Sequence, residues 1–313
     1  SSYWEVLPQL SDDYANIYFS KDGEDLRCFL LKMNCEKIEI HSYIGSGIKY
    51  THRLSMFCID YEVYIHDYSW ICPRITLMSY NDLYCGEPSL TTCKRCIADL
   101  GASNNDDTDI QTIRAISDDL FRRAKKVIAP CRDVVGRFKR YFDTKIVIGP
   151  WELPINEQPL RFLHKRAQDY RRILIVGAIS LEKGYRVLLE LARYSAENDL
   201  PLRFCIVGFT CDDKKLLETG VVEITGRYAE EEVSTLIQRQ SCDWGFLPAV
   251  WPETWSYVLS ELWKQNLPVI AFDIGAPAER IRSSKSGLVI PLHLPVSSIV
   301  NILINPQLYS QNE

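Results

Sequence analysis

Short runs of β-branched residues alternate with segments of helical apolar spacing from Arg171 to the C-terminus. This order is typical of βαβ units built around a parallel sheet. The expected strands are Ile173–Ala178, Leu202–Gly208, Val221–Thr225, Asp243–Leu247, Leu267–Phe272 and Leu288–Ile290. The expected helices between and after them are Lys183–Glu197, Asp213–Glu218, Glu230–Arg239, Trp255–Lys264, Pro277–Arg282 and Val296–Leu303. The pattern therefore predicts a complete doubly wound domain.

The N-terminal half is less regular, but its pattern also favours an α/β domain. The expected strands are Arg27–Leu31, Ile38–Tyr43, Tyr61–His66, Lys126–Ala129 and Lys145–Ile148. A chain of 313 residues is long enough for two such domains. The Pro-containing segment 150–168 is the expected linker, so we divide the chain into domains 1–155 and 156–313.

Composition excludes some classes of protein. A net charge of -5 and a pI near 5.7 disfavour a nucleic-acid partner, which normally requires a basic surface. The sequence has no apolar run long enough for a transmembrane helix, and its first residues lack the order of a signal peptide. We expect a cytoplasmic protein whose 11 cysteines are reduced thiols or metal ligands.

The most informative segment, 248–279, reads as strand end, loop, helix, strand, loop and helix. Ligands of parallel α/β sheets bind beyond the carboxyl ends of the strands, where Glu253, Thr254, Trp255 and Ser256 fall. Free N–H groups at the helix start favour a diphosphate, and the Thr254 and Ser256 hydroxyls can add donors. This segment therefore predicts a phosphate site.

Two carboxylates in this segment suit a sugar and a ribose. Glu253 would repel phosphate, but it can accept from neighbouring sugar hydroxyls. Glu261 follows after seven residues, about two helical turns on, and could accept from the two hydroxyls of a ribose. The alternative is that Glu253 is an ordinary loop acid and Glu261 a solvated helix residue.

This spacing resembles the Glu, seven residues, Glu motif of retaining glycosyltransferase family 4, and VIAFDIGAPAER after it is also similar to that family. The resemblance implies the GT-B fold, in which two Rossmann-like domains face a cleft. It also implies that Glu253 contacts the donor sugar and Glu261 the ribose. Such enzymes need no catalytic metal.

The segment Gly177–Gly184, GAISLEKG, resembles the strand, turn and Lys-Gly segment of the same family. Lys183 would neutralise the diphosphate, and Gly184 would allow close approach of the backbone. The family usually has Arg four residues before this Lys, whereas this chain has Ile179. Arg227 is either a replacement near the base or phosphate, or an ordinary surface residue.

His66 ends the expected strand in YEVYIHDY and matches a family His that points at the donor sugar. The alternative is a packed structural histidine. Four cysteines follow within a short span, and they are either ligands of a structural zinc ion or reduced buried thiols. They are Cys72, Cys85, Cys93 and Cys96.

The sequence motifs HDY, CPR, YCGEP and CxxC, in this order, resemble those of a subgroup of bacterial glycosyltransferases found in multidomain polysaccharide-assembly proteins. Nothing in residues 1–50 resembles the Gly-rich loop that opens the family's N-terminal domain, so we expect an abbreviated domain. The basic stretch 121–140 is expected to be a solvated helix face; the alternative is peripheral binding to the inner membrane, where lipid-linked acceptors occur.

The sequence thus predicts a retaining hexosyltransferase that moves a sugar from a nucleotide-diphosphate sugar to a growing glycan, of polysaccharide or O-antigen type. Its expected partners are the nucleotide sugar, a glycan or lipid-linked glycan acceptor, and other domains of a larger enzyme. Two alternatives stay open. One is a non-catalytic glycan-binding or scaffolding domain of this fold, and the other is a sugar-nucleotide epimerase.

Overall fold

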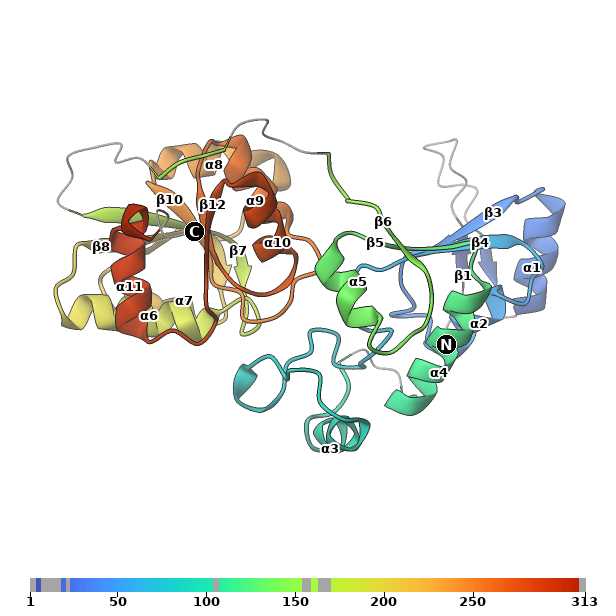
Figure 1. Ribbon diagram of the computed structural model, residues 1–313. Coiled ribbons are helices and arrows are strands. Elements are labelled where there is room, and N and C mark those ends of the chain that lie inside the picture. The colour runs from blue at the N-terminus through green and yellow to red at the C-terminus, as the bar shows by residue number, and fades with distance from the viewer. Residues whose placement is uncertain are drawn as a thin grey trace. The chain divides into compact units, whose positions relative to one another are not determined.

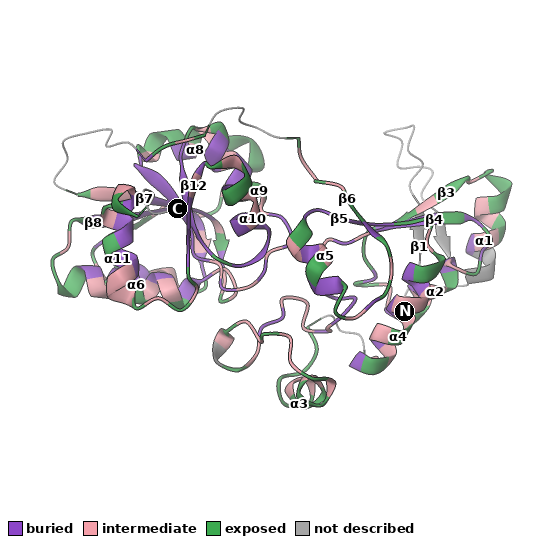
Figure 2. Cartoon of the chain, in the orientation of Figure 1, coloured by how far each residue is buried: buried purple, intermediate pink, exposed green. Residues whose placement is uncertain are grey.

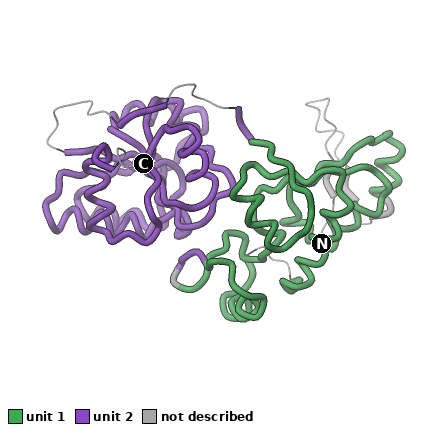
Figure 3. Tube along the Cα trace, in the orientation of Figure 1, with its two compact units in different colours: residues 1–80, 85–150 green, residues 81–84, 151–313 purple. Residues whose placement is uncertain are grey.

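The computed structural model describes residues 4–6, 18–20, 23–103, 107–153, 159–162 and 170–309. The chain divides into two compact units, each an α/β unit with a parallel sheet (Figure 3). Unit 1 holds residues 1–80 and 85–150, and unit 2 holds residues 81–84 and 151–313. Residues 154–158 and 163–169 of the expected linker lie outside the described residues.

Unit 2 is built on a six-stranded sheet with the order β12-β11-β10-β7-β8-β9, and all of its strand pairs are parallel. The strands are β7 (Arg171–Ile179), β8 (Leu202–Thr210), β9 (Val222–Ile224), β10 (Trp244–Leu247), β11 (Val269–Phe272) and β12 (Gly287–Ile290). Each strand expected in this half of the sequence is present, with ends shifted by no more than a few residues.

Helices cover both faces of the sheet of unit 2 (Figure 1). They are α6 (Tyr185–Glu197), α7 (Asp213–Leu217), α8 (Val233–Gln240), α9 (Tyr257–Lys264), α10 (Gly275–Ser284) and α11 (Val296–Ile304). Side chains of α8, α9 and α10 form one buried cluster with Leu174, Val176 and Val269 of the strands. Because both faces of the sheet are covered, the strands are largely buried (Figure 2), and β10 and β11 at its centre are buried along their whole length, as expected of a parallel sheet.

Unit 1 has a smaller, four-stranded parallel sheet with the order β3-β4-β5-β6. Its strands are β3 (Lys37–Ile40), β4 (Asp60–Tyr64), β5 (Lys126–Ala129) and β6 (Ile146–Ile148). Its helices are α1 (Gly23–Lys32), α2 (Ile48–Leu54), α3 (Leu90–Leu100), α4 (Ile110–Arg123) and α5 (Arg132–Phe138). A separate antiparallel pair joins β1 (Trp4–Val6) and β2 (Tyr18–Ser20). The core beside the sheet is aromatic, with Trp70, Phe121, Phe138 and Phe142 in contact.

Two expectations for this unit are wrong. The segment Arg27–Leu31 is part of helix α1 rather than a strand, because Leu26, Phe29 and Leu30 recur at helical spacing and Leu26 is buried. The basic stretch 121–140 is not one helix face, because strand β5 interrupts it between α4 and α5. No helix in the described part of the chain is long and apolar enough to cross a bilayer.

A buried ion pair fastens the loop before α3 to the rest of unit 1. The Glu87 side chain is fully buried, and its carboxylate lies 2.5 Å from Arg137 Nη1 and 3.3 Å from Arg140 Nη1. Tyr141 donates its hydroxyl to the same carboxylate at 3.3 Å. Arg137 also pairs with Asp133, one turn earlier on α5, at 2.6 Å. Glu87 is thus the acidic centre of a buried network.

Replacing Glu87 with Ala should lower the free energy of unfolding by roughly 3 kcal/mol, since it leaves the buried Arg137 without this partner, although Asp133 still neutralises Arg137. Urea unfolding followed by far-ultraviolet circular dichroism measures the loss. The control is Asp118→Ala, which removes the exposed Asp118–Arg122 pair and should cost less than about 1 kcal/mol. Equal losses for both variants would refute the importance of the buried network.

Candidate functional site

The site lies at the switch point of the sheet in unit 2. Strands β7 and β10 are neighbours, but the chain continues from β7 to β8 on one side and from β10 to β11 on the other. At such a point the loops beyond the carboxyl ends diverge and leave a crevice for a ligand. The loops here are 180–184 after β7 and 248–256 after β10.

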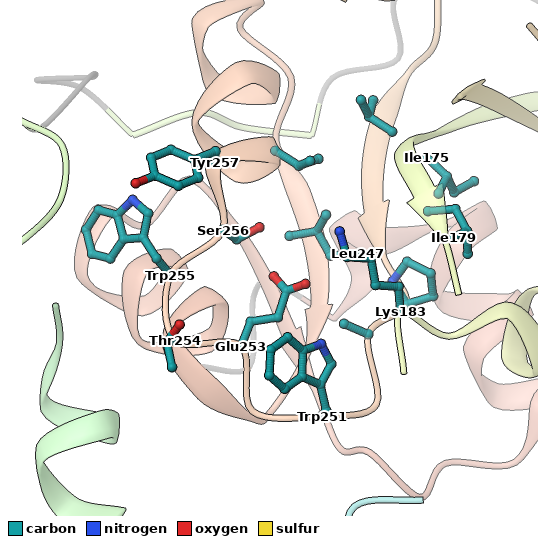
Figure 4. Close-up of a pocket in the computed structure, with 14 residues that line it drawn as sticks. Ile175, Ile179, Lys183, Leu247, Trp251, Glu253, Thr254, Trp255, Ser256 and Tyr257 are labelled. Carbon is teal, nitrogen blue, oxygen red and sulfur yellow. The ribbon is translucent and has the colours of Figure 1, made fainter. Parts of the chain in front are cut away.

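A pocket of about 260 Å³ opens between these loops (Figure 4). Its lining is mostly apolar and aromatic, with Lys183 as the only basic and Glu253 as the only acidic residue among the described residues that form it. The lining residues are Ile175, Val176, Ile179, Lys183, Leu247, Pro248, Ala249, Trp251, Glu253, Thr254, Trp255, Ser256, Tyr257 and Val258. Five of the expected site residues, Lys183 and Glu253–Ser256, are therefore brought together.

The loops after β7 and β10 are joined backbone to backbone. Gly184 has φ +88°, and a Cβ at this position would lie 1.9 Å from the Pro248 carbonyl oxygen. The Val250 N–H donates to the Glu182 carbonyl at 2.9 Å. The Gly184 position thus requires glycine because of Pro248, in addition to the close approach to a diphosphate expected from the sequence. Its contact fixes Lys183 against the far loop.

A second glycine, which the sequence analysis did not single out, holds the Glu253 segment. Gly275 begins α10 with φ +70°, and a Cβ there would lie 2.7 Å from the Glu253 nitrogen. The Ala276 N–H donates to the Glu253 carbonyl oxygen at 2.8 Å. The sequence signal that could have indicated this residue is a glycine at the start of a helix that follows a buried strand. The loop of β10 therefore rests on the loop of β11.

The Glu253 carboxylate and the Lys183 ammonium point into the same pocket (Figure 4). Burial raises the pKa of Glu253, and nearby Glu182 acts in the same direction. The positive charge of Lys183 and the Ser256 hydroxyl lower this pKa, but by less than burial raises it. Lys183 and Ser256 therefore favour the ionised form of Glu253, which can accept hydrogen bonds from a ligand, against the effect of burial.

Helix α9 begins at Tyr257, directly behind the pocket, and no side chain caps its first N–H groups. Those groups and the positive end of the helix dipole favour an anion. Glu261 lies on α9 but outside the pocket lining, where it pairs with Lys264 at 2.6 Å. Its charge also raises the pKa of Tyr228, after burial and Glu230. Glu261 is thus near Tyr228, beyond β9.

The remaining expected donor residues lie outside this pocket. Gly177 is inside β7 opposite Gly208, and a Cβ on Gly208 would lie 2.0 Å from the Gly177 carbonyl oxygen. This pair of glycines lets two strands approach. Arg227 is exposed and its guanidinium stacks on Phe209, 4.1 Å from the ring centroid. Neither residue lines the pocket.

His66, in unit 1, lies beyond the carboxyl end of β4. Its Nε2 is 2.8 Å from His41 Nδ1, and the two rings are stacked with centroids 5.1 Å apart. Burial lowers the pKa of His66, as does the charge of His41, while Asp67 acts in the opposite direction. His66 is therefore kept neutral, as its expected role requires, and His41 is a partner that spacing did not indicate.

The expected zinc site is not supported. In the part of the chain that the structure describes, no three His, Cys, Asp or Glu side chains converge to hold a metal ion. Cys93 Sγ instead accepts from Arg114 Nη2 at 3.6 Å, and Cys85 Sγ accepts from the Glu87 N–H at 3.3 Å. Burial raises the pKa of Cys72 to about 12, which keeps the thiol protonated. The alternative reading, reduced thiols, agrees with these contacts.

Residues 156–303 match the family model described as glycosyl transferases group 1. This part of unit 2 is therefore similar to group 1 glycosyltransferases. The match covers the six-stranded sheet and both loops that form the pocket. No curated protein sequence matches the chain.

Solved structures of glycosyltransferases share the fold. TarM has a TM-score of 0.60 at 14% identity, over 95% of this chain and 53% of its own. Sucrose-phosphate synthase from Thermosynechococcus elongatus has a TM-score of 0.59 at 16% identity, and the match covers 91% of this chain and 68% of that one. The lipopolysaccharide outer core galactosyltransferase WaaB has a TM-score of 0.58 at 13% identity, and the match covers 91% of this chain and 70% of that one. The GT-B fold is therefore confirmed, and this chain spans about half the length of TarM.

Replacing Gly275 with Ala should destabilise the protein by about 1–3 kcal/mol beyond the cost of the backbone conformation, because the new Cβ overlaps the Glu253 backbone. Gly220→Ala is the matched control, with φ +72° and no atom within 4 Å of the added Cβ. Thermal or urea unfolding compares the two variants. If they lose the same stability, the close contact at Gly275 does not matter.

Proposed function

We propose that the chain is a retaining glycosyltransferase that takes a sugar from a nucleotide-diphosphate sugar and passes it to a glycan. The observation that carries the proposal is that Lys183 and Glu253 line the same pocket at the switch point of the sheet. A single cation beside a helix N-terminus suits a diphosphate, and a carboxylate deeper in the loop suits sugar hydroxyls.

In this proposal each group has a separate task. Lys183 and the first N–H groups of α9 neutralise the diphosphate as its bond to the anomeric carbon loosens. Glu253 accepts from the hydroxyls of the donor sugar and so fixes the anomeric carbon. Glu261, beside Tyr228, accepts from the ribose, with the base beyond it. The acceptor hydroxyl attacks on the face that the leaving group vacates and gives its proton to the departing nucleoside diphosphate, so the configuration is retained.

The comparisons suggest the first ligand to test. A TarM mutant from S. aureus was solved with UDP, fondaparinux and alpha-GlcNAc-glycerol. We infer that a uridine nucleotide is a suitable donor class and that the acceptor is a glycan of polysaccharide type, joined by a hexosyl transfer. His66 is proposed to donate to the donor sugar, since its neutral ring can do so.

One observation favours the scaffolding alternative. Ile179 lines the pocket where the family usually places an arginine, and it is almost completely buried. The diphosphate thus meets one side-chain cation rather than two among the described lining residues. A protein that only binds glycans would tolerate this loss, whereas a transferase must rely on Lys183 and the helix end.

We expect UDP to bind the protein in a calorimetric titration. Lys183→Met should weaken this binding at least ~10-fold, because it removes the cation that faces the phosphates. Glu253→Gln should bind UDP almost normally but lose transfer from a UDP-sugar, because only the sugar contacts this carboxylate. The control is Lys214→Met, an exposed lysine on α7 outside the pocket.

No binding of UDP, GDP or dTDP to the native chain would reject the transferase and favour the scaffold. Binding of UDP with unchanged affinity in Lys183→Met would instead place the nucleotide elsewhere. Normal sugar transfer by Glu253→Gln would remove Glu253 from the proposed mechanism. Product formed from the UDP-sugar without an acceptor would favour an epimerase.

A further inference from the structure

The backbone at Ser256 is in a conformation that residues with a Cβ rarely adopt. Ser256 has φ 145° and ψ 96° and directly precedes α9. Residues other than glycine are strained in this backbone conformation, and such strain persists only where the surroundings enforce it. Ser256 lines the proposed donor pocket. Some other group must therefore hold this turn.

Arg280 of α10 is bonded to the strained turn. Its Nη1 donates to the Ser256 carbonyl oxygen at 2.7 Å, and its Nη2 donates to Ser260 Oγ at 2.7 Å. The guanidinium lies 3.9 Å from the ring centroid of Trp255 and 5.4 Å from that of Trp263. Its side chain is only 11% exposed. The two rings fix the plane of the guanidinium, so its two donors point in set directions.

A carboxylate from the start of unit 2 completes this arrangement. Glu152 accepts from Trp255 Nε1 at 2.8 Å and from Ser260 Oγ at 2.5 Å, and it lies 3.7 Å from Arg280 Nη2. The partly buried cation thus has a counter-ion, without which its burial would be costly. We call Arg280, Trp255, Trp263, Ser260 and Glu152 the Arg280 clamp. The clamp enforces the backbone of the Ser256 turn.

The side chain of Ser256 points the other way, into the pocket that Glu253 also lines (Figure 4), and its hydroxyl is a donor that lowers the pKa of the Glu253 carboxylate. Besides Ser256, the groups that face this carboxylate are Trp251 of the same loop and Lys183 and Glu182 of the loop after β7. Lys183 and Trp251 do not depend on the clamp. Ser256 is thus the connection between the clamp and the residue proposed to bind the sugar.

We propose that Arg280 is a positioning residue, which holds the Ser256 turn in its strained form so that the Ser256 hydroxyl orients Glu253 toward the donor sugar. Arg280 would touch neither sugar nor phosphate, since it is not among the pocket residues. The role in sugar recognition rests on the proposed function. The connection from Arg280 through Ser256 to Glu253 does not, and it can be tested without a substrate.

The direct test is the pKa of Glu253, measured by ¹³C NMR of protein labelled at the glutamate carboxyl carbons. Glu253→Gln assigns the resonance by its disappearance. Ser256→Ala removes a hydrogen bond that favours the carboxylate, so the pKa should rise. Arg280→Met should raise it in the same direction, because the released turn withdraws the same hydroxyl. Arg282→Met, a half-exposed residue of the same helix, should leave it unchanged.

The proposal would be overturned if the pKa of Glu253 rose in Ser256→Ala but not in Arg280→Met, because Arg280 would then act on packing alone. An unchanged pKa in Ser256→Ala would overturn it as well. If Arg280→Met does not fold, Arg280→Lys replaces it: a lysine keeps the charge near Glu152 but cannot donate in a fork to Ser256 and Ser260. This variant should shift the pKa in the same direction.

The strain gives an independent readout. Ser256→Gly and Ser256→Ala both lose the hydroxyl, but only glycine adopts φ 145° without strain. We expect Ser256→Gly to unfold at a higher temperature than Ser256→Ala in differential scanning calorimetry. The opposite order would show that the turn is not strained.

With a UDP-sugar donor, Arg280→Met and Arg280→Lys should lose ~10- to 100-fold in kcat while their affinity for UDP stays unchanged. Because the pKa of Glu253 is raised in these variants, their activity should be lost at a higher pH than that of the native protein as the pH falls.

If UDP does not bind but the pKa of Glu253 shifts in the Arg280 variants, the transferase is rejected and the positioning role of Arg280 is kept. If UDP binds normally but this pKa does not shift, the positioning role is rejected and the transferase is kept. The two proposals therefore fail separately.

Discussion

Direct contact between backbones at the switch point of unit 2 is the constraint on which the site depends. Gly184 lies against the carbonyl of Pro248, and Gly275 lies against the backbone of Glu253. Main-chain atoms cannot change rotamer, so these contacts transmit the geometry of three neighbouring strands to three loops. The separation of Lys183 and Glu253 is thereby set by the sheet. The pocket is consequently a property of the fold and not of flexible side chains.

The fold of unit 2 could be predicted because its physical signal is strong. Strands buried on both faces, such as β7 and β8, are continuous apolar runs, and the amphipathic segments between them are helices. Unit 1 gave a weaker signal. The apolar run of α1 looks like a strand when read for β propensity, and its helical spacing involves few buried residues. Helix α3 buries none of its residues.

The site could be predicted only in part. The rule that ligands lie beyond the carboxyl ends of parallel strands indicated Glu253–Ser256, the family resemblance indicated Lys183, and all five residues line one pocket. No rule of spacing links Glu152 or Arg280 to them, because Glu152 and Trp255 are 103 positions apart in the sequence. The metal expectation failed for a related reason. Spacing shows that four cysteines are near one another along the chain, but not that their sulfur atoms converge.

The peripheral position of α3 has a consequence for how unit 1 opens. Without a buried side chain of its own, the helix is held by polar contacts at its edges, including Arg74 Nη1 to the Leu100 carbonyl and Arg114 Nη2 to Cys93. Such segments exchange their amide protons through local fluctuations that leave the sheet intact. Helix α3 therefore forms a low-stability local unit, and proteases would reach it before the aromatic core of unit 1 unfolds.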